Sequence, residues 1–412
     1  MVEFLFWGSL LALAYTYGGY PAFLRVLCFL RPKPVRSDAE ADLVPYVTLI
    51  VSAYNEQDVI RHKILNCIDQ DYPREKLDIL VASDSSNDDT ETIVQNFAGE
   101  GVRLVRCEGR IGKTACLNRA VEMARGEILV FSDANSFYEK SAIKFLVSRF
   151  SDPAVGFVTG HTKYSLHPSN LEMAPVGLYA KLETWIKSME SRIGSCVGAD
   201  GAIFAVRKSL YTPLDPDDIN DLVLPLKIVG QGYRGILEER AYCSEKTGES
   251  PAEEYMRQVR ITSRTLKGIL ENATLLNPLR HPLFAWQLAS HKLTRLVMPF
   301  LLILLFSSSL ALALRGDREI YQTALACQGI SYALGAFGRL RKGQGITTKA
   351  ASLAHVFVTV NAAVLVGWIK YLRGERYTSW SSRRRTNPAR PCRTAPENQN
   401  PGKASEPAFR EP

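Results

Sequence analysis

Four short, β-rich segments lie between residues 47 and 132, and each of the first three is followed by a polar loop and a helical pattern. The segments span residues 47–53, 77–82, 102–107 and 128–132. Strands that alternate with helices usually pair in parallel, with the helices covering the faces of the sheet. We therefore expect an α/β fold with a mostly parallel sheet, whose ligands gather at the carboxyl ends of the strands.

Polar residues stand at those strand ends. They are Asn55 and Glu56 after the first segment, Asp84 after the second, Gly112 and Lys113 after the third, and Asp133 and Asn135 after the fourth. Asp84 can accept hydrogen bonds from the imide of a uracil, or it can simply cap a turn. Lys113 can bring an ammonium group to a diphosphate, or it can begin a solvated helix. Asp133 and Asn135 offer oxygen ligands to a hard divalent cation, although such residues are also common in ordinary loops.

Three further polar clusters follow the fourth segment. They are Asp200 in the glycine-rich stretch 198–202, the acidic residues Asp215, Asp217, Asp218 and Asp221, and the group Arg257, Gln258, Arg260 and Arg264. The glycines would let a backbone approach a ligand, or they form a tight turn. The acidic residues precede an apolar helical pattern, so one of them can cap a helix or serve as a base. The basic group places several side chains on one helical face, as either phosphate binding or a membrane surface would require.

Apolar segments flank this region on both sides. They span residues 4–24, 296–314, 321–338 and 351–372. The first segment is uncharged and lacks the flanks of a cleavable signal, so we expect residues 1–30 to form a transmembrane anchor. Residues 283–295 have the pattern of an interfacial amphipathic helix, and residues 296–372 hold the C-terminal transmembrane segments. Residues 378–412 are rich in Arg, Pro, Asn and Ser, which predicts disorder.

The positions of the positive charges predict the topology. Arg25, Arg31, Lys33 and Arg36 follow the first apolar segment, and by the positive-inside rule they mark the cytosolic side. The domain at residues 44–270 would then face the cytosol in a multi-pass protein of the cell membrane. Three complete C-terminal spans would export the Arg-rich tail, so we expect one of them to be interfacial or re-entrant.

Three other classes of protein are disfavoured. The formal net charge of +8 is concentrated beside apolar segments and in the C-terminal tail, which indicates a lipid bilayer rather than nucleic acid as partner. Eight cysteines are scattered without a C-x-x-C pair, which argues against a zinc site and predicts reduced thiols. The Gly-Lys-Thr at residues 112–114 is not a P-loop, because Cys107 stands where that motif requires glycine.

In order and spacing, the polar residues resemble the family 2 glycosyltransferases, which have the GT-A fold, a Rossmann-like nucleotide-diphospho-sugar transferase fold. The resemblance covers about residues 47–268. The flanking apolar segments resemble the membrane-integrated branch of that family, which makes cellulose, chitin or hyaluronan-type polymers. The resemblance implies a UDP-sugar donor, a Mg²⁺ or Mn²⁺ ion, inversion at the anomeric carbon and a cytosolic catalytic face.

The same resemblance implies roles for individual residues. Asn55, Glu56, Asp84, Lys113 and Asp133 would bind the donor, Asp133 and Asn135 the metal, and Asp200, Arg257, Gln258 and Arg260 the acceptor or diphosphate, with Asp221 as the catalytic base. Asp84 matches the uridine-binding aspartate. Asn135 replaces the second aspartate of the D-x-D motif. In processive members a Q-[QR]-x-R-W motif follows the base. Here Arg260 is retained, but Ile261 replaces the tryptophan that stacks near the acceptor sugar.

We therefore expect a membrane-bound inverting hexosyltransferase that moves a sugar from a UDP-sugar to a growing polysaccharide or oligosaccharide. An alternative is transfer of one sugar to a lipid, such as a polyprenyl phosphate or a ceramide. A third possibility is an inactive membrane subunit, which the presence of Asp84, Asp133 and Asp221 disfavours.

Overall fold

The computed structural model describes residues 1–33, 44–165, 174–246, 251–316, 318–340 and 346–378. Arg36 and all but the first residue of the segment 378–412, for which disorder is predicted, lie outside these ranges.

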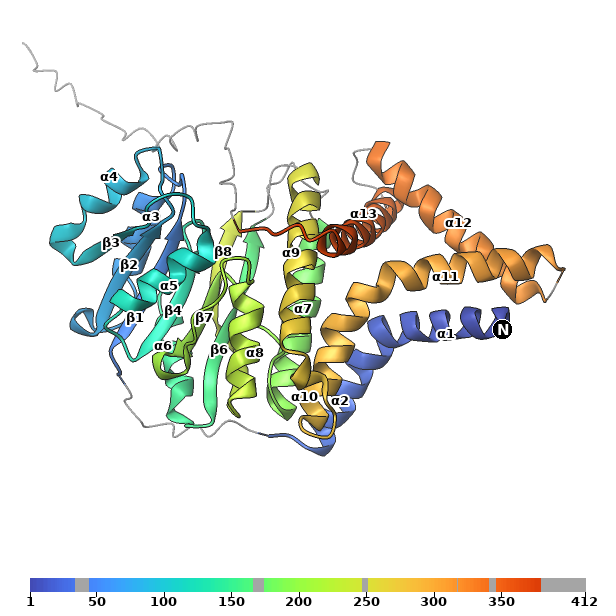
Figure 1. The fold of residues 1–412 in the computed structure, drawn as a ribbon, viewed down its shortest axis with the longest axis horizontal. Helices are drawn as coiled ribbons and strands as arrows, with labels where there is room; N and C mark the ends of the chain where they lie inside the picture. The colour runs from blue at the N-terminus through green and yellow to red at the C-terminus, as the bar shows by residue number, and fades with distance from the viewer. Residues whose placement is uncertain (34–43, 166–173, 247–250, 317, 341–345, 379–412) are drawn as a thin grey trace, which may run out of the picture. The chain divides into compact units, whose positions relative to one another are not determined.

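An eight-stranded mixed sheet forms the centre of the fold (Figure 1). Its strands, in spatial order, are β3 (Val102–Arg106), β2 (Leu77–Ser83), β1 (Val47–Ala53), β4 (Ile128–Asp133), β7 (Ile203–Arg207), β6 (Val155–Ser165), β8 (Arg234–Lys246) and β5 (Phe137–Tyr138). The first four run parallel, and Val47 of β1 lies opposite both Leu77 and Ile128. These four strands are the ones predicted from the sequence, with ends within one residue of the predicted ends.

The other half of the sheet departs from the expected parallel order, because β7 is antiparallel to both β4 and β6. The segment that leads into β7 explains this direction. The Cys196 N–H donates to Gly235 O near the start of β8, and further along the segment Asp200 binds Thr162 near the end of β6. The chain therefore enters β7 from the end at which β6 finishes. A run of glycines and small residues carries no signal for that reversal.

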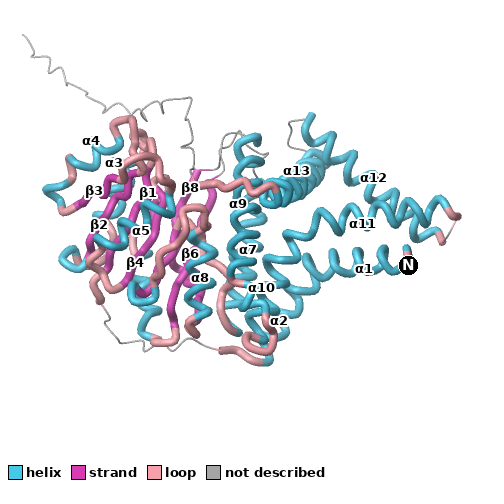
Figure 2. The backbone as a smooth tube through the Cα atoms, viewed as in Figure 1, coloured by secondary structure: helices cyan, strands magenta, loops and turns pink. Residues whose placement is uncertain are grey.

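Helices cover both faces of the sheet (Figure 2). One face packs against α3 (Ile60–Ile68), α4 (Thr90–Gln95) and α6 (Ala142–Ser148), and the other packs against α5 (Lys113–Met123), α8 (Asn220–Gly230) and α9 (Pro251–Glu271). In β1, Leu49 and Val51 pack in the core on the side of α3, α4 and α6, whereas Ile50 packs in the core on the side of α5, α8 and α9. This alternation follows the two-residue period of a strand and explains why the central strands are apolar on both sides.

The terminal regions are helical. At the N-terminus α1 (Val2–Ala14), a π-helical turn (Tyr15–Gly19) and α2 (Tyr20–Leu30) follow one another without a break. At the other end α10 (Pro282–Leu288), a second π-helical turn (Ala289–Leu293) and α11 (Thr294–Leu314) do the same, and α12 (Glu319–Leu340) and α13 (Ile346–Leu372) come after them. The residues predicted to form a separate interfacial helix, 283–295, are thus continuous with α11.

Two of the described helical runs are long and apolar enough to cross a membrane. They are Pro282–Leu314 and Ala350–Leu372. The N-terminal run is not one of them, because the more polar residues Tyr15–Gly19 at its centre lower its mean hydropathy. The transmembrane anchor at residues 1–30 therefore stays a prediction. Its helix α1 nevertheless packs along α11, where Phe6 is buried beside Leu305 and Leu312.

Candidate active site

Asp84 is fully buried at the carboxyl end of β2, beneath the loop that leads into α5. Its Oδ1 accepts hydrogen bonds from the backbone N–H groups of Ile111 (2.8 Å) and Gly112 (3.2 Å), and its Oδ2 lies 3.1 Å from the same Gly112 nitrogen. The carboxylate therefore fixes the loop that carries Lys113. Its predicted contact with a nucleobase stays a prediction, but the structure gives Asp84 a clear part in building the strand-end site.

The loop after β1 is tied to the loop after β2. Asn55 adopts a left-handed backbone with φ of 51°, which asparagine tolerates better than most residues. Its N–H donates to Ser86 Oγ (3.1 Å), and its Oδ1 accepts from the Asn87 N–H (2.9 Å). The Glu56 N–H donates to Thr90 Oγ1 (2.8 Å). These contacts place Asn55 and Glu56 at the same edge of the sheet as Asp84.

Lys113 and Asp133 meet across this edge. Lys113 begins α5, Asp133 ends β4, and the Lys113 Nζ forms an ion pair with Asp133 Oδ1. Asn135 lies half-buried two residues further along the same short loop. The carboxylate of Asp133 and the amide oxygen of Asn135 are hard oxygen ligands, the kind that a divalent cation prefers.

The segment that follows α13 lies against the start of α5. Gly112 has a φ of 94°, and a Cβ atom at this position would collide with the backbone carbonyl of Thr378. Nearby, Arg376 Nη1 lies 3.6 Å from Asp217 Oδ2. Gly112 is therefore required twice, for its positive φ and for the close approach of the chain beyond α13.

Asp221 lies in the first turn of α8, and its surroundings differ from those of the other acidic residues. Its Oδ1 is buried and has no hydrogen-bond partner among the described residues. Burial raises the pKa of Asp221 above its ordinary value, and the charges of Lys113 and Lys187 only partly oppose this effect. Gly201 lies so close that a Cβ atom there would be 2.9 Å from Asp221 Oδ2. An aspartate with one oxygen unused and a raised pKa has the properties of a general base.

The carboxylate of Asp200 is held by hydrogen bonds to neighbouring residues. Its two carboxylate oxygens accept hydrogen bonds from Thr162 Oγ1 (3.0 and 2.9 Å), the Thr162 N–H (2.9 Å) and the Ala202 N–H (3.1 Å). These bonds anchor the glycine-rich stretch to β6. The binding role expected for Asp200 is untested, and its oxygens already have protein partners.

The basic residues of α9 do not act as one group. Arg257 and Gln258 both contact Glu254, with Arg257 Nη1 at 3.3 Å and Gln258 Nε2 at 2.7 Å. Arg264 instead donates to Thr114 Oγ1 (3.1 Å) at the start of α5 and to backbone carbonyls of the acidic loop. Arg260 lies between them and is half-buried. Of the residues predicted to bind diphosphate or acceptor, Arg260 keeps a guanidinium without a side-chain hydrogen bond among the described residues.

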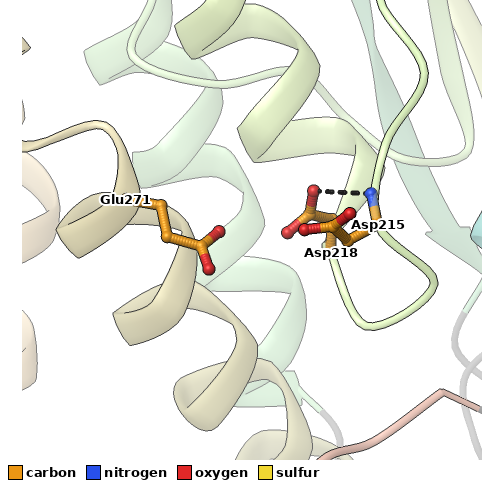
Figure 3. Close-up of side chains that lie close together, drawn as sticks. All are labelled: Asp215, Asp218 and Glu271. Atoms are coloured by element: carbon orange, nitrogen blue, oxygen red, sulfur yellow. Dashed lines mark hydrogen bonds between the residues drawn. The ribbon is translucent and has the colours of Figure 1, made fainter.

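An acidic cluster outside this edge is built around a lysine. Figure 3 shows Asp215, Asp218 and Glu271, whose carboxylate oxygens lie within 4.8 Å of one another. Lys267 Nζ lies 2.8 Å from Asp218, 3.3 Å from Glu271 and 3.5 Å from Asp215. The ammonium group supplies the positive charge that these carboxylates need, so the cluster holds the loop before α8 against α9.

The sequence analysis missed a buried support beneath the Asp133–Asn135 loop. Lys63 of α3 is fully buried, and its Nζ donates to the backbone carbonyl of Ser136 and lies 4.2 Å from the ring centre of Tyr138. One helical turn later, Asn66 donates to Tyr138 O (2.9 Å) and accepts from the Tyr138 N–H (2.8 Å). On the other side, the Ser136 hydroxyl donates to buried Glu245. A lysine within an apolar helical pattern was the available signal.

Comparison with known proteins shows what the chain is similar to. Residues 48–205 match the family described as Glycosyl transferase family 2. The poly-beta-1,6-N-acetyl-D-glucosamine synthase of Staphylococcus aureus (strain MSSA476) is 26% identical over 220 residues, 52% of this chain and 52% of that protein. The probable glycosyltransferase YdaM of Bacillus subtilis (strain 168) is 25% identical over 202 residues, 46% of this chain and 48% of its own length. The chain thus spans about half the length of the curated relatives it matches.

A solved structure has the same fold. A mannosyltransferase from Pyrobaculum calidifontis, determined in complex with GDP-Man and Mn²⁺, superposes with a TM-score of 0.69. The superposition covers 91% of this chain and 100% of the other, at 22% sequence identity. Residues 48–205 of this chain thus match a glycosyl transferase family 2 domain, and the fold is a mixed α/β fold of the GT-A type.

Proposed function

We propose that this chain is a membrane-bound inverting glycosyltransferase that transfers a sugar from a UDP-sugar to a saccharide acceptor. The observation that carries the proposal is Asp221, whose buried Oδ1 has no partner among the described residues. The charge of Lys113 lowers the pKa of Asp221, and Lys113 is itself ion-paired with Asp133. A candidate base and a candidate diphosphate site therefore lie in one electrostatic neighbourhood.

The donor would be held at the strand-end edge. The Asp84 carboxylate and the backbone around Asn55 would border the nucleoside, and Lys113 would bind the diphosphate. Asp133 and Asn135 would hold a Mg²⁺ or Mn²⁺ ion, which when bound stabilises the negative charge of the leaving diphosphate. The chain's own residues thus hold the leaving group on one side of the anomeric carbon.

Asp221 would act on the other side. Inversion requires an acceptor hydroxyl to attack from the face opposite the diphosphate, and the Asp221 carboxylate would take the proton of that hydroxyl. A raised pKa makes the carboxylate a better proton acceptor than an ordinary aspartate, provided that it is ionised at the working pH. Gly201 packs so close to Asp221 Oδ2 that a side chain at this position would displace the carboxylate.

The relatives indicate which donor to test first. The Staphylococcus aureus relative is named for a polymer of N-acetylglucosamine, so we propose UDP-N-acetylglucosamine as the leading donor. Ile261 favours a second candidate, transfer of a single sugar to a lipid such as a polyprenyl phosphate, because the tryptophan of the processive motif is absent. In both cases the two long apolar helices would sit in the membrane and the catalytic domain would face the cytosol.

A donor screen on the full-length protein reconstituted in lipid tests the proposal. UDP release would be measured with a panel of UDP-sugars, with GDP-mannose as a donor of different base. Mass spectrometry of the products would distinguish a polymer from a lipid carrying one sugar. UDP release that depends on Asp221 would support the proposal. No nucleotide release with any donor would instead support the hypothesis that the protein is an inactive membrane subunit.

A further inference from the structure

A cavity lies at the far end of α8 from Asp221. Its volume is about 500 Å³, and it is bordered by the last turn of α8, the turn Ala273–Leu276 and the residues just before α10. Asp221 lies in the first turn of the 11-residue helix α8, whereas Lys227 and Gln231 of the cavity lie at its other end. None of the residues expected to bind the donor or the acceptor lines this cavity.

The cavity is lined by hydrogen-bond donors and by positive charge. Lys227 and Arg280 contribute cationic side chains and His281 contributes an imidazole, whereas the amide nitrogens of Gln231 and Asn272 already donate to Leu210 O (3.3 Å) and Gly268 O (2.8 Å). No aspartate or glutamate is among the lining residues. Among the described residues, Lys227 Nζ has one contact, with Pro213 O at 3.3 Å, and the Arg280 guanidinium has no ion pair. A concave site whose lysine and arginine form no ion pair among the described residues, and whose lining has no carboxylate, is suited to a phosphate group.

The position of the cavity points toward a membrane surface. His281 directly precedes the helical run Pro282–Leu314, whose apolar part is long enough to cross a bilayer. On the other side of Arg280, Leu279 is 92% exposed. The turn is held rigid by Asn277, which accepts from the Leu279 N–H (2.9 Å) and the Arg280 N–H (3.2 Å). A fixed basic turn beside an exposed leucine and the start of a membrane helix is an arrangement that binds phospholipid headgroups.

We propose that this cavity binds the phosphate group of an anionic ligand, supplied either by a phospholipid headgroup or by free phosphate. Arg280 provides a planar guanidinium that can bind two phosphate oxygens, and Lys227 provides a point charge from the opposite wall. If the phosphate belongs to a lipid, Leu279 lies beside the acyl chains. This site is independent of the sugar-transfer reaction, because it shares no side chain with the strand-end edge.

The test uses the full-length protein in a neutral detergent and three probes. They are short-chain phosphatidylglycerol, short-chain phosphatidylcholine and inorganic phosphate. Apparent dissociation constants would be taken from the increase in melting temperature with probe concentration. The variants are Arg280→Gln and Lys227→Gln. Arg315→Gln serves as the matched control, because it removes one exposed arginine at the opposite end of the same helical run.

We expect phosphatidylglycerol to bind the wild type more tightly than phosphatidylcholine. Arg280→Gln should weaken that binding about tenfold or more, the scale of one charge-assisted contact, and Arg315→Gln should leave it unchanged. Inorganic phosphate that binds as tightly as the lipid would identify free phosphate as the ligand, and no phosphate binding would identify the headgroup. Equal binding of the two lipids without phosphate binding would overturn the proposal. Anionic-ligand binding that survives both Arg280→Gln and Lys227→Gln would overturn it too. The melting temperature of each variant without probe shows that it is folded.

Discussion

The ammonium group of Lys113 is ion-paired with the carboxylate of Asp133, so the residue expected to bind phosphate and the residue expected to bind metal are partners in the donor-free protein. A divalent cation that binds Asp133 must compete with this lysine. A diphosphate that arrives with the cation offers Lys113 a new anionic partner. The ion pair therefore suggests that metal and donor bind together, with Lys113 passing from the carboxylate to the diphosphate.

The first prediction concerns Lys113→Met. Without the competing ammonium group, Mn²⁺ should bind the donor-free protein more tightly, by up to about 1 kcal/mol because the pair is partly exposed. The KM for the donor should rise, because the diphosphate loses its lysine. Calorimetric titration with Mn²⁺ and initial-rate kinetics measure the two effects. Lys140→Met removes a surface lysine paired with Asp69 and should change neither quantity. Weaker Mn²⁺ binding by Lys113→Met would contradict the proposal that Lys113 competes with the cation for Asp133.

The second prediction concerns Asn135→Asp. A carboxylate binds a hard divalent cation more strongly than an amide oxygen does, so this variant should bind Mg²⁺ or Mn²⁺ more tightly and retain turnover. Wild-type turnover should stop in EDTA and return when the metal is restored. A titration of activity against metal concentration measures both effects. Loss of metal affinity in Asn135→Asp would show that Asn135 is not a ligand.

The third prediction concerns Lys63, which supports the loop of Asp133 from below. In Lys63→Met the new side chain has a similar length but leaves the Ser136 carbonyl without a hydrogen-bond donor. This loss costs about 1–3 kcal/mol of folding free energy, which is offset because a charge is no longer buried. We expect the protein to remain folded while its affinity for Mn²⁺ falls. Asn66→Ala, which frees the Tyr138 backbone, should weaken metal binding in the same direction. Unchanged metal affinity in both variants would show that α3 does not position the loop.

Lys63 also gives a pH signature in stability. Burial lowers its pKa below the ordinary value of about 10.5. The unfolded chain therefore binds a proton more readily than the folded protein between the lowered pKa and about 10.5. The free energy of unfolding of the wild type should accordingly rise relative to that of Lys63→Met as the pH increases through this window. Denaturant titrations at several alkaline pH values would measure the difference, and a constant difference would contradict the assignment.

The sequence predicted the strand-end edge because its signals are local. An apolar run of five to seven residues followed by Asp or Asn identifies a strand and its carboxyl end, and parallel strands bring such ends together. Asp84 and Asp133 were predicted at strand ends in this way, whereas Lys113 was predicted from the Gly-Lys pair after the third segment. The direction of β7 was not predicted. It depends on contacts of the preceding segment with Gly235 and Thr162, and these contacts leave no periodic pattern in the sequence. Lys63 was missed for a related reason, since its partner Ser136 lies 73 residues away in the chain.

The assignment of the base improved once contacts were known. The sequence offered Asp217, Asp218 and Asp221 in one loop, and only family spacing separated them. In the structure Lys267 Nζ lies 2.8 Å from both Asp217 and Asp218, whereas Asp221 Oδ1 has no partner among the described residues. Asp217 and Asp218 are thus engaged in ion pairs, and Asp221 remains the carboxylate that we propose as the base.

The fourth prediction follows from that distinction. Asp221→Asn should keep donor binding and lower turnover by about 10²- to 10⁴-fold, the usual contribution of a general base. Asp218→Asn should instead lower stability, because it removes a carboxylate from the ion-pair cluster around Lys267. UDP release, donor affinity and melting temperature separate the two effects. Normal turnover in Asp221→Asn with loss of turnover in Asp218→Asn would move the assignment to Asp218.

The last prediction uses pH to identify the base. Because burial raises the pKa of Asp221, turnover should fall on the acidic side at a higher pH than the ordinary aspartate value of about 3.9 would give. Lys187 is a second buried lysine, and its Nζ donates to Ala199 O (3.0 Å) on the stretch that borders Asp221. Its charge lowers the pKa of Asp221. Lys187→Met removes that charge, so the carboxylate should become harder to ionise.

The acidic limb of the pH–kcat profile should therefore move to higher pH in Lys187→Met, while turnover well above the limb should stay near that of the wild type. A merely structural role for Lys187 would lower turnover at every pH without moving the limb. Lys208→Met is a suitable control, because its Nζ also donates to a backbone carbonyl, Ala124 O at 2.6 Å, but its charge is not among the main influences on the Asp221 pKa. An acidic limb that stays in place in Lys187→Met would mean that another group takes the acceptor proton.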